Sequence, residues 1–407
     1  MEWASGGTRG ETAPALSRGT TQTGVRLYNE RLILSLVRLH GQLPKAEMAR
    51  LTGLSAQTVS VIVRQLEADR LLKRRTPRRG KVGQPLVPFE LDPEGAFSIG
   101  LKVGRRSGDL MLLDLAGHVR HTIHRPYAFP SPLELMSFVT TGVAELTGGL
   151  SASQRERISG LGIAAACELW NWAEEVGAPQ DVLMAWREFD LQAEIARLLP
   201  WPIHFCNDAS AACAAELLFG CGRDLPDFAY FYLGYFIGGG VVLNGNLYLG
   251  RRGNAGALAS FPVTSGTGRS QQLVHATSLA ALEREIQRDG GDPELLWRDV
   301  ATWHGVGPAL DRWMDGAAAQ VATACAGVMA VLDCSAVVID GAVPLQVRAD
   351  FVARVRRALE AVDRQGLAEF AVLEGTIGAD ARALGAASLP LFDNFMINRN
   401  VLFKERD

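Results

Sequence analysis

The chain has 407 residues, of which 48% are hydrophobic and 21% are charged. This length exceeds one compact core and allows two or three domains, and the composition is that of a folded globular protein. We find no run of about 18 apolar residues, which argues against a membrane span. Residues 1–24 lack the apolar core of a secretory signal. We therefore expect a disordered tail over residues 1–24 and a cytoplasmic protein with no membrane partner.

The cysteines give no sign of a metal site. None of the six form a Cys-x-x-Cys pair, and they lie in apolar or helical stretches, as buried free thiols do. A structural zinc site needs closely spaced ligand pairs. The sequence therefore predicts no metal and no cofactor. The six are Cys167, Cys206, Cys213, Cys221, Cys325 and Cys334.

The net charge of −3 conceals an asymmetry between the two ends of the chain. Met1–Glu90 carries 15 basic and 7 acidic side chains, whereas the rest of the chain carries 26 basic and 37 acidic ones. A basic N-terminal segment on an acidic remainder indicates a polyanionic partner for that segment alone.

The basic segment begins with two predicted helices. Apolar residues recur at helical spacing over Val25–Leu39, which predicts an amphipathic helix there. A shorter helix is expected over Lys45–Thr52. Pro44 suits its first turn, and Gly53 suits its C-terminal cap.

A third helix is expected over Ala56–Asp69, with Ser55 as its N-cap. One of its stripes should be buried, and this stripe consists of Val59, Ile62, Val63 and Leu66. A second stripe is short, polar and lightly charged, and it consists of Gln57, Ser60, Val61 and Arg64. Glutamine can read adenine edges and valine can contact a thymine methyl group. A helix, a tight glycine turn and such a second helix form the helix-turn-helix arrangement.

A strongly basic stretch follows this helix. Six of the nine residues in Lys73–Lys81 are basic, and an apolar pair, Leu86–Val87, comes shortly after. This pattern predicts a β-hairpin wing whose tip brings cations to phosphates or to the minor groove. We expect the second stripe to read bases. The expected contacts to the phosphates or the minor groove are Thr58, Arg74, Arg78, Arg79 and Lys81. Ser55, the expected N-cap, is also counted among the DNA-binding residues.

Each of these features alone has an ordinary interpretation. A basic run is usually a solvated surface, and a three-helix bundle can be a protein-interaction domain. Their coincidence within one short segment favours binding of double-stranded DNA.

From Phe97 onward, strands and helices alternate in two similar series. The expected elements of the first series are strands over Phe97–Val103, Leu110–Leu115, Val119–His124 and Ile158–Ile163, with a helix over Pro132–Leu146. The expected elements of the second series are strands over Phe228–Leu233, Gly240–Leu243 and Ala336–Ile339, with helices over Leu279–Arg288 and Leu310–Val331. Asn244–Gly245 is a strong hairpin signal.

Several motifs resemble those of the ROK family (repressor, open reading frame, kinase), which includes sugar-responsive repressors. In the N-terminal segment these are Asn29, Lys45–Ala49, Thr52–Ser55 and Thr58–Ser60. In the remainder they are Gly160–Ile163, Asn207–Ala209, Gly238–Gly240 and Gly253–Gly256. The resemblance extends from Val25 to the C-terminus. It implies an α/β protein, with a winged helix-turn-helix over residues 25–92 and a two-lobed, actin-like sugar-kinase domain over residues 95–407.

The departures from the family pattern fall on the nucleotide side of the implied cleft. Where the kinases carry an Asp-x-Gly-Gly-Thr motif for Mg²⁺ and phosphate, this chain has Lys102 in place of the carboxylate, followed by Arg105 and Arg106. In the second phosphate loop, Tyr235 and Phe236 replace small residues. Bulky side chains where backbone must approach phosphate argue against a working kinase.

The family's zinc motif is also missing. Its cysteine run has no counterpart in Thr264–Ala276, and Ser260 stands where the motif has its histidine. His275 is a lone histidine and is expected to be structural. Ala257 replaces the glutamate that binds sugar in the family.

Part of the implied sugar site remains. Asn207 and Asp208 match the family's pair, in which the aspartate contacts sugar hydroxyls. The pair could instead cap the following helix, but its place at the predicted cleft favours ligand contact. Trp170, Trp172 and Trp186 could stack on a sugar or pack in the core. The expected ligand contacts are Asn171, Asn207, Asp208 and Asn254.

The sequence therefore predicts a transcriptional regulator, of repressor type, for carbohydrate-related genes. Its expected partners are a DNA operator, a small polyol or sugar effector, and further copies of itself in a homodimer or homotetramer, since operators are usually read by dimers. Two alternatives stay open. One is an active ROK sugar kinase that also binds DNA, and the other is a regulator without a small ligand.

Overall fold

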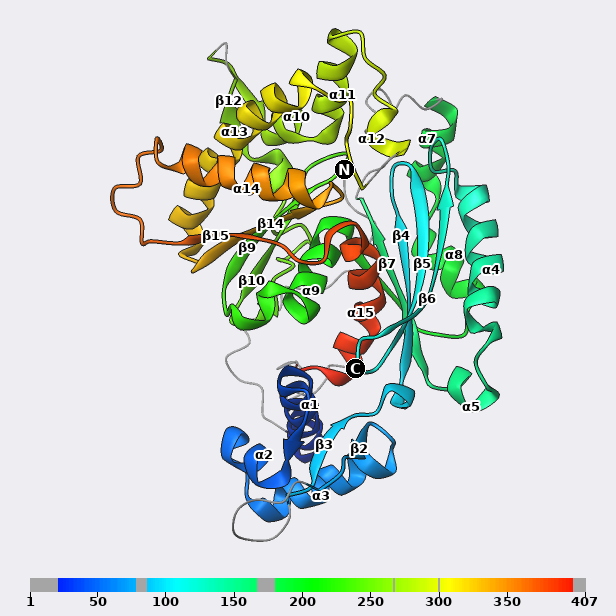
Figure 1. The fold of residues 1–407 in the computed structure, drawn as a ribbon. Coiled ribbons are helices and arrows are strands. Elements are labelled where there is room, and N and C mark those ends of the chain that lie inside the picture. Colours follow the sequence, from blue (N-terminus) through cyan, green and yellow to red (C-terminus); the bar gives the residue numbers. More distant parts are fainter. Residues whose placement is uncertain (1–20, 78–85, 167–179, 266–267, 299–300, 398–407) are drawn as a thin grey trace, which may run out of the picture. The chain divides into compact units, whose positions relative to one another are not determined.

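The computed structural model describes residues 21–77, 86–166, 180–265, 268–298 and 301–397. These form two units (Figure 1). The head comprises residues up to Asp92 together with those from Phe392 onward, and the body comprises Pro93–Leu391. The sequence analysis assigned the whole C-terminus to the body. This was wrong, because the backbone N–H of Ile397 donates a hydrogen bond to Ser35 Oγ in the head, at 3.2 Å.

The head contains the three expected helices, α1 (Gln22–His40), α2 (Lys45–Thr52) and α3 (Ala56–Ala68). Helix α1 begins within the segment expected to be a disordered tail, because the Thr21 side chain caps it by accepting a hydrogen bond from Gly24 N. Gly53 ends α2 in the left-handed conformation, with φ at 71°, which favours glycine.

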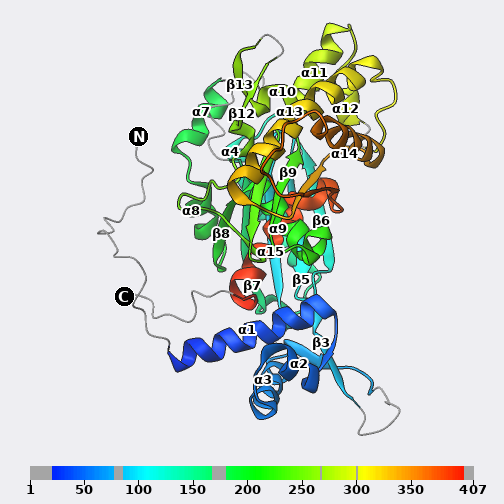
Figure 2. The ribbon, with the colours of Figure 1, turned by 90° about the vertical axis from the view of Figure 1, so that its left-hand side faces the viewer.

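The core of the head lies between α1 and α3. The inner stripe of α3 is buried as predicted, and it meets buried residues of α1. A small antiparallel sheet, visible beside the helices in Figure 2, completes the winged fold. Its strands, in the order β1-β3-β2, are β1 (Leu43–Pro44), β2 (Leu72–Arg74) and β3 (Pro88–Leu91).

The body contains two five-stranded sheets with the same topology. In each sheet three strands pair antiparallel and two more extend the sheet in parallel. The first has the order β6-β5-β4-β7-β8, with β4 (Phe97–Val103), β5 (Ser107–Asp114), β6 (Val119–Pro126), β7 (Ile158–Ala165) and β8 (Ile203–Asn207). The second has the order β11-β10-β9-β14-β15, with β9 (Phe228–Leu233), β10 (Gly238–Leu243), β11 (Asn246–Leu247), β14 (Ala336–Gly341) and β15 (Ala371–Glu374). This repetition confirms the two-lobed fold expected from the resemblance.

Helices cover both sheets (Figure 1). The helices that accompany the first sheet are α4 (Pro132–Gly148), α5 (Ala152–Arg155), α7 (Gln180–Glu188) and α8 (Leu191–Leu198). Those of the second lobe are α10 (Leu273–Thr277), α11 (Leu279–Arg288), α12 (Leu295–Arg298), α13 (Pro308–Leu332) and α14 (Leu345–Leu359). Helix α9 (Asp208–Phe219) contacts strands of both sheets, and α15 (Ala381–Phe395) lies against the first sheet. The short elements are β12 (Pro262–Thr264), β13 (Ser270–Gln272), η1 (Pro93–Gly95), η3 (Cys221–Asp224), η4 (Leu258–Ser260) and η5 (Gly378–Asp380).

Helix α13 is long and apolar enough, by length and composition alone, to cross a membrane. In this structure it packs against α10, α11 and α14, and its buried residues belong to the core of the second lobe. The helix is thus used as a core helix here.

Helix α15 lies against the first sheet of the body at unusually close range. A side chain at Gly100 of β4 or at Gly162 of β7 would collide with the backbone of Ala387 or Ala386. The Ser98 hydroxyl donates a hydrogen bond to Ala387 O at 2.5 Å. Glycine is therefore needed at these two strand positions because helix and strand backbones touch there.

We predict that Gly162→Ala lowers the free energy of unfolding by about 1–3 kcal/mol, since the new methyl group forces α15 away from β7. Chemical denaturation of the full chain would measure this. Gly148→Ala is the matched control, because a Cβ there meets nothing within 4 Å and an alanine favours the helix. Equal stability of the two variants would contradict the close packing of α15 on β7.

Candidate functional site

The outer face of α3 presents the side chains expected to read DNA bases. Gln57, Val61 and Arg64 are exposed, and Ser60 is half-buried. Val61 is 59% exposed, although large apolar side chains usually avoid water. Ser55 and Thr58 play a different part, because Ser55 Oγ accepts a hydrogen bond from Thr58 N at 3.1 Å and the two hydroxyls hydrogen-bond at 2.8 Å. The Ser55 hydroxyl thus caps α3, as predicted, and the Thr58 hydroxyl is its hydrogen-bond partner.

The base of the wing is less cationic than its sequence indicates. Lys73 lies 3.5 Å from Glu90, and Arg75 lies 3.1 Å from the same carboxylate. Arg74 pairs with Glu67 at 2.5 Å. These pairs are exposed and each contributes little stability, but Arg74 must exchange Glu67 for phosphate if it binds DNA. The expected tip cations Arg78, Arg79 and Lys81 lie outside the described residues.

In the body, the end of β8 and the start of α9 hold Asn207 and Asp208. Ala209 N donates hydrogen bonds to Asn207 Oδ1 at 3.1 Å and to Asp208 Oδ1 at 2.9 Å. The capping role left open by the sequence is therefore present. Asp208 Oδ2 also accepts a hydrogen bond from Arg382 Nη1 at 3.2 Å. Each oxygen of this carboxylate thus has one protein partner, and a carboxylate has room for more.

Lys102 lies on β4 and is only 7% exposed. Its ammonium group donates hydrogen bonds to Ser107 Oγ at 2.7 Å and to Asp109 Oδ2 at 2.6 Å. Burial, followed by the charge of Arg382, lowers the pKa of Lys102 to about 8. Burial opposes ionisation of Asp109, but Lys102 and His124 more than offset it, so the pKa of Asp109 is lowered.

Two arginines from the β4–β5 turn contact the second lobe of the body. Arg105 stacks over the Tyr235 ring at 5.4 Å, and Arg106 stacks over the Trp297 ring at 5.0 Å. Arg106 also pairs with Glu294 at 2.9 Å and with Glu283 at 3.3 Å. Stacking and ion pairs therefore hold the β4–β5 turn against the second lobe.

The aromatic side chains of the loop between β9 and β10 pack on each other. The rings of Tyr235 and Phe236 meet edge to face at 4.9 Å, and Tyr235 lies 6.0 Å from the ring of Trp297. Trp297 Nε1 donates a hydrogen bond to Glu283 at 2.6 Å. This loop is therefore built as a packed aromatic cluster.

Of the predicted ligand residues other than Asn207 and Asp208, the structure describes Asn254. Asn254 is exposed on the loop after β11, and no hydrogen bond joins it to Asp208 in the described structure. Asn171, Trp170 and Trp172 lie outside the described residues. Trp186 is a core residue, because it is 5% exposed and its Nε1 donates a hydrogen bond to Pro130 O.

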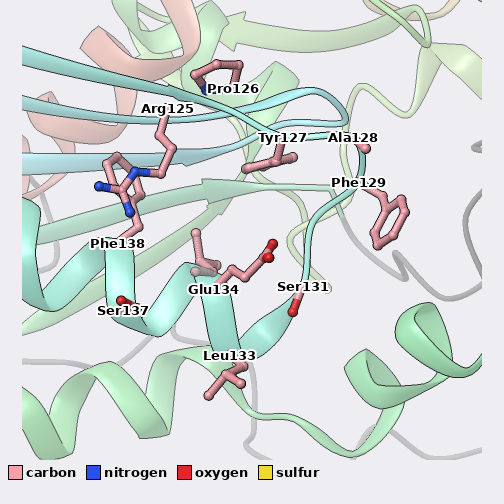
Figure 3. A pocket seen from close by; sticks show the side chains of 11 residues that line it. Arg125, Pro126, Tyr127, Ala128, Phe129, Ser131, Leu133, Glu134, Ser137 and Phe138 are labelled. Atoms are coloured by element: carbon pink, nitrogen blue, oxygen red, sulfur yellow. The ribbon is translucent and has the colours of Figure 1, made fainter.

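A cavity of about 680 Å³ opens between the end of β6 and the start of α4 (Figure 3). Its lining includes Arg125, Tyr127, Glu134 and Phe138. The Arg125 guanidinium stacks on the Phe138 ring at 4.9 Å. The sequence analysis named none of these residues, because their neighbours in the chain carry no motif. Among the described residues, no group of three His, Cys, Asp or Glu side chains is placed to hold a metal ion.

Beside Asp208 lies Arg382, a residue that the sequence analysis did not identify. Its partner Asp208 is 174 residues away in the chain, so no local pattern connects them. One signal was available, since Arg382 is the only charged residue between Ala381 and Leu391.

Comparison with known proteins gives two family matches. The model of the ROK family matches residues 98–391, and that of the MarR family matches residues 28–81. A xylose repressor from Bacillus spizizenii is 25% identical over 242 residues, which cover 60% of this chain and 62% of that protein. The chain therefore spans less than two thirds of the length of this relative.

Solved structures of both regulators and kinases share the fold. A ROK family transcriptional regulator, described as a homologue of the E. coli MLC protein, aligns with a TM-score of 0.66 at 18% identity, covering 93% of this chain and 99% of that one. A ROK family glucokinase from Streptomyces griseus, in complex with glucose and AMPPNP, aligns with a TM-score of 0.56 at 22% identity, covering 72% of this chain and 99% of that one. The regulator's match extends over most of the chain, whereas the kinase's match leaves more than a quarter of it uncovered.

We predict a pH dependence of stability that Lys102 causes. The unfolded chain holds this proton up to the ordinary pKa of 10.5, whereas the folded chain releases it near pH 8. Between these values the unfolded state binds more protons, so the contribution of Lys102 to the free energy of unfolding rises with pH, by at most on the order of 3 kcal/mol.

Urea denaturation at several pH values between 8 and 10.5 would measure this effect against Lys102→Met. The free energy of unfolding of the wild type, minus that of the variant, should increase as the pH rises. A difference that stays constant across this window would show that the Lys102 proton is bound equally in both states.

Proposed function

The chain belongs to the ROK family, and from this premise we propose that it is a DNA-binding transcriptional regulator, of repressor type, whose body senses a small polyhydroxylated ligand without phosphorylating it. A MarR-type winged helix-turn-helix ahead of a sugar-kinase-like domain is the organisation of such a regulator. The head would bind operator DNA in the cytoplasm, and a homodimer or homotetramer would supply the second head for a symmetric site.

The single observation that carries the non-catalytic part of the proposal is the contact of Arg105 and Arg106 with the second lobe. Phosphoryl transfer depends on backbone that approaches phosphate and on a carboxylate that holds Mg²⁺. Here a buried ammonium replaces the carboxylate, and Arg105 stacks on Tyr235 where the second loop should receive phosphate. These contacts favour a regulator over the rival hypothesis of an active kinase.

The ligand part of the proposal depends on Asp208. Its carboxylate is half-buried and retains acceptor capacity beyond Ala209 N and Arg382. Vicinal hydroxyl groups of a polyol are suitable donors for such a carboxylate. The named xylose repressor makes a sugar the first class of ligand to examine, with carbohydrate-related genes as the regulated targets.

We expect the full chain to bind a DNA fragment selected by it from a random library, with an affinity that falls steeply with salt. The logarithm of the association constant should decrease with a slope of about −0.9 per phosphate neutralised. Gln57→Ala should relax the base preference, whereas Arg79→Ala should weaken binding to all sequences alike. Fluorescence anisotropy across a salt series would measure both effects.

The deletion of Met1–Leu91 is the control for this experiment. Sequence-specific DNA binding that survives the deletion would place the DNA-binding surface outside the head.

We expect a ligand that binds at Asp208 to raise the melting temperature of the protein by a few degrees, since binding to the folded state alone stabilises it by about 2.7 kcal/mol at a hundred times the Kd. The probes are D-xylose, D-glucose, N-acetyl-D-glucosamine and their phosphates. Asp208→Ala should abolish the response, and Glu194→Ala, an exposed carboxylate on α8, should keep it. An unchanged response of Asp208→Ala would move the ligand site elsewhere.

A further inference from the structure

Helix α15 is the one helix whose residues belong to both units of the described structure. Its part up to Leu391 lies in the body and its part from Phe392 lies in the head. We propose that α15 carries the state of the candidate ligand site to the DNA-binding head, and that the ion pair between Asp208 and Arg382 is the link at its first turn. This proposal rests on the proposed function, in which Asp208 contacts the ligand.

The start of α15 is held by two buried carboxylates. Glu216 accepts hydrogen bonds from the backbone N–H of Thr376 at 2.9 Å and of Ile377 at 3.2 Å. Asp340 accepts hydrogen bonds from Gly378 N at 3.0 and 3.1 Å. Both carboxylates are fully buried, so they are costly to leave without partners. The loop that enters α15 is thereby fixed to the body.

Arg382 follows directly in the first turn. Its guanidinium pairs with Asp208 at 3.2 Å and stacks over the Tyr232 ring at 5.1 Å. The side chain is 15% exposed, and although burial disfavours its charge, Tyr232 and Asp208 raise the pKa of Arg382. A ligand hydroxyl that binds Asp208 competes with Arg382 for the same carboxylate. Ligand binding therefore weakens the ion pair between Asp208 and Arg382.

The middle of α15 transmits such a change as a rigid element. Its backbone touches β4 and β7 at Gly100 and Gly162, and a side chain at Gly385 would collide with Ala211 of α9. With a rise of 1.5 Å per residue, the fifteen residues of α15 span about 22 Å. Pro390 has no N–H for the Ala386 carbonyl, so the helix lacks this one backbone hydrogen bond.

The residues that directly follow α15 contact α1. Met396 is 5% exposed, its sulfur lies 3.7 Å from Ser35 Oγ, and the same hydroxyl accepts a hydrogen bond from Ile397 N. Burial lowers the pKa of Arg31 on α1, and the charge of Asp393 opposes this effect. Helix α1 in turn packs on α3, which presents the DNA-reading face. A change at Asp208 thus has a continuous route to α3.

Hydrogen exchange of the full chain tests this proposal without any ligand. We expect Asp208→Asn and Arg382→Met to raise amide exchange at least threefold in the body part of α15, in residues 392–397 and in the facing part of α1. Arg382→Lys keeps the charge and should restore most of the protection. Arg288→Met, which breaks a surface pair with Glu285 at 2.7 Å on α11, is the matched control and should leave the head unchanged.

The outcomes are distinct. Faster exchange in both α15 and the head after Asp208→Asn or Arg382→Met supports the coupling. Faster exchange confined to the body, or head exchange that the Arg288 control raises equally, overturns it. If Arg382→Met fails to fold, Asp208→Asn, which conserves shape, decides alone. Neither result bears on whether the head binds DNA or whether the body binds sugar, since those are measured separately.

Discussion

The ammonium group of Lys102 lies almost wholly out of water, and its need for negative partners organises the middle of the body. An unpaired buried charge is prohibitively costly, so Ser107 and Asp109 are held against it. The charges of Arg382 and Asp208 also act on Lys102. By the resemblance of the sequence to the ROK kinases, we expect this position to correspond to the carboxylate that organises Mg²⁺ there. Under that correspondence, a buried ammonium paired with Asp109 takes the place of the carboxylate.

The neighbouring turn is also held by protein contacts. Arg105 and Arg106 contact aromatic rings and carboxylates of the second lobe. The sugar side has changed less, because Asn207 and Asp208 remain at the start of α9. The unequal change of the two sides favours a body that has kept ligand recognition and lost phosphoryl transfer. To change DNA binding by the head, a ligand must bind one conformation of the protein more tightly than the other by a few kcal/mol. A ligand with equal affinity for both conformations leaves their populations unchanged.

The sequence was most informative where local rules govern. The bounds of α2, β4, β9 and α11 match their predictions, because periodicity, caps and β-branched runs are local signals. Asn244 and Gly245 both have positive φ, as their hairpin signal predicted. The inner stripe of α3 is buried and its outer stripe is largely exposed, as the helical spacing required.

Long-range partners could not be predicted in this way. The pair of Arg382 with Asp208, the contact of Met396 with Ser35 and the carboxylates that hold the start of α15 join residues far apart in the chain. For the same reason the sequence alone does not show that the C-terminal residues belong to the head, or that Glu67 pairs with Arg74. Whether a cation is available depends on which carboxylates the fold brings to it.

We propose that the body of this ROK protein does not use nucleotide. Titration of the full-length protein with Mg-ATP in a calorimeter, with D-glucose present and product phosphate followed in the same samples, measures this. We expect no saturable binding at millimolar Mg-ATP and no sugar phosphate. Saturable binding with a micromolar Kd, or transfer of phosphate to the sugar, would contradict it.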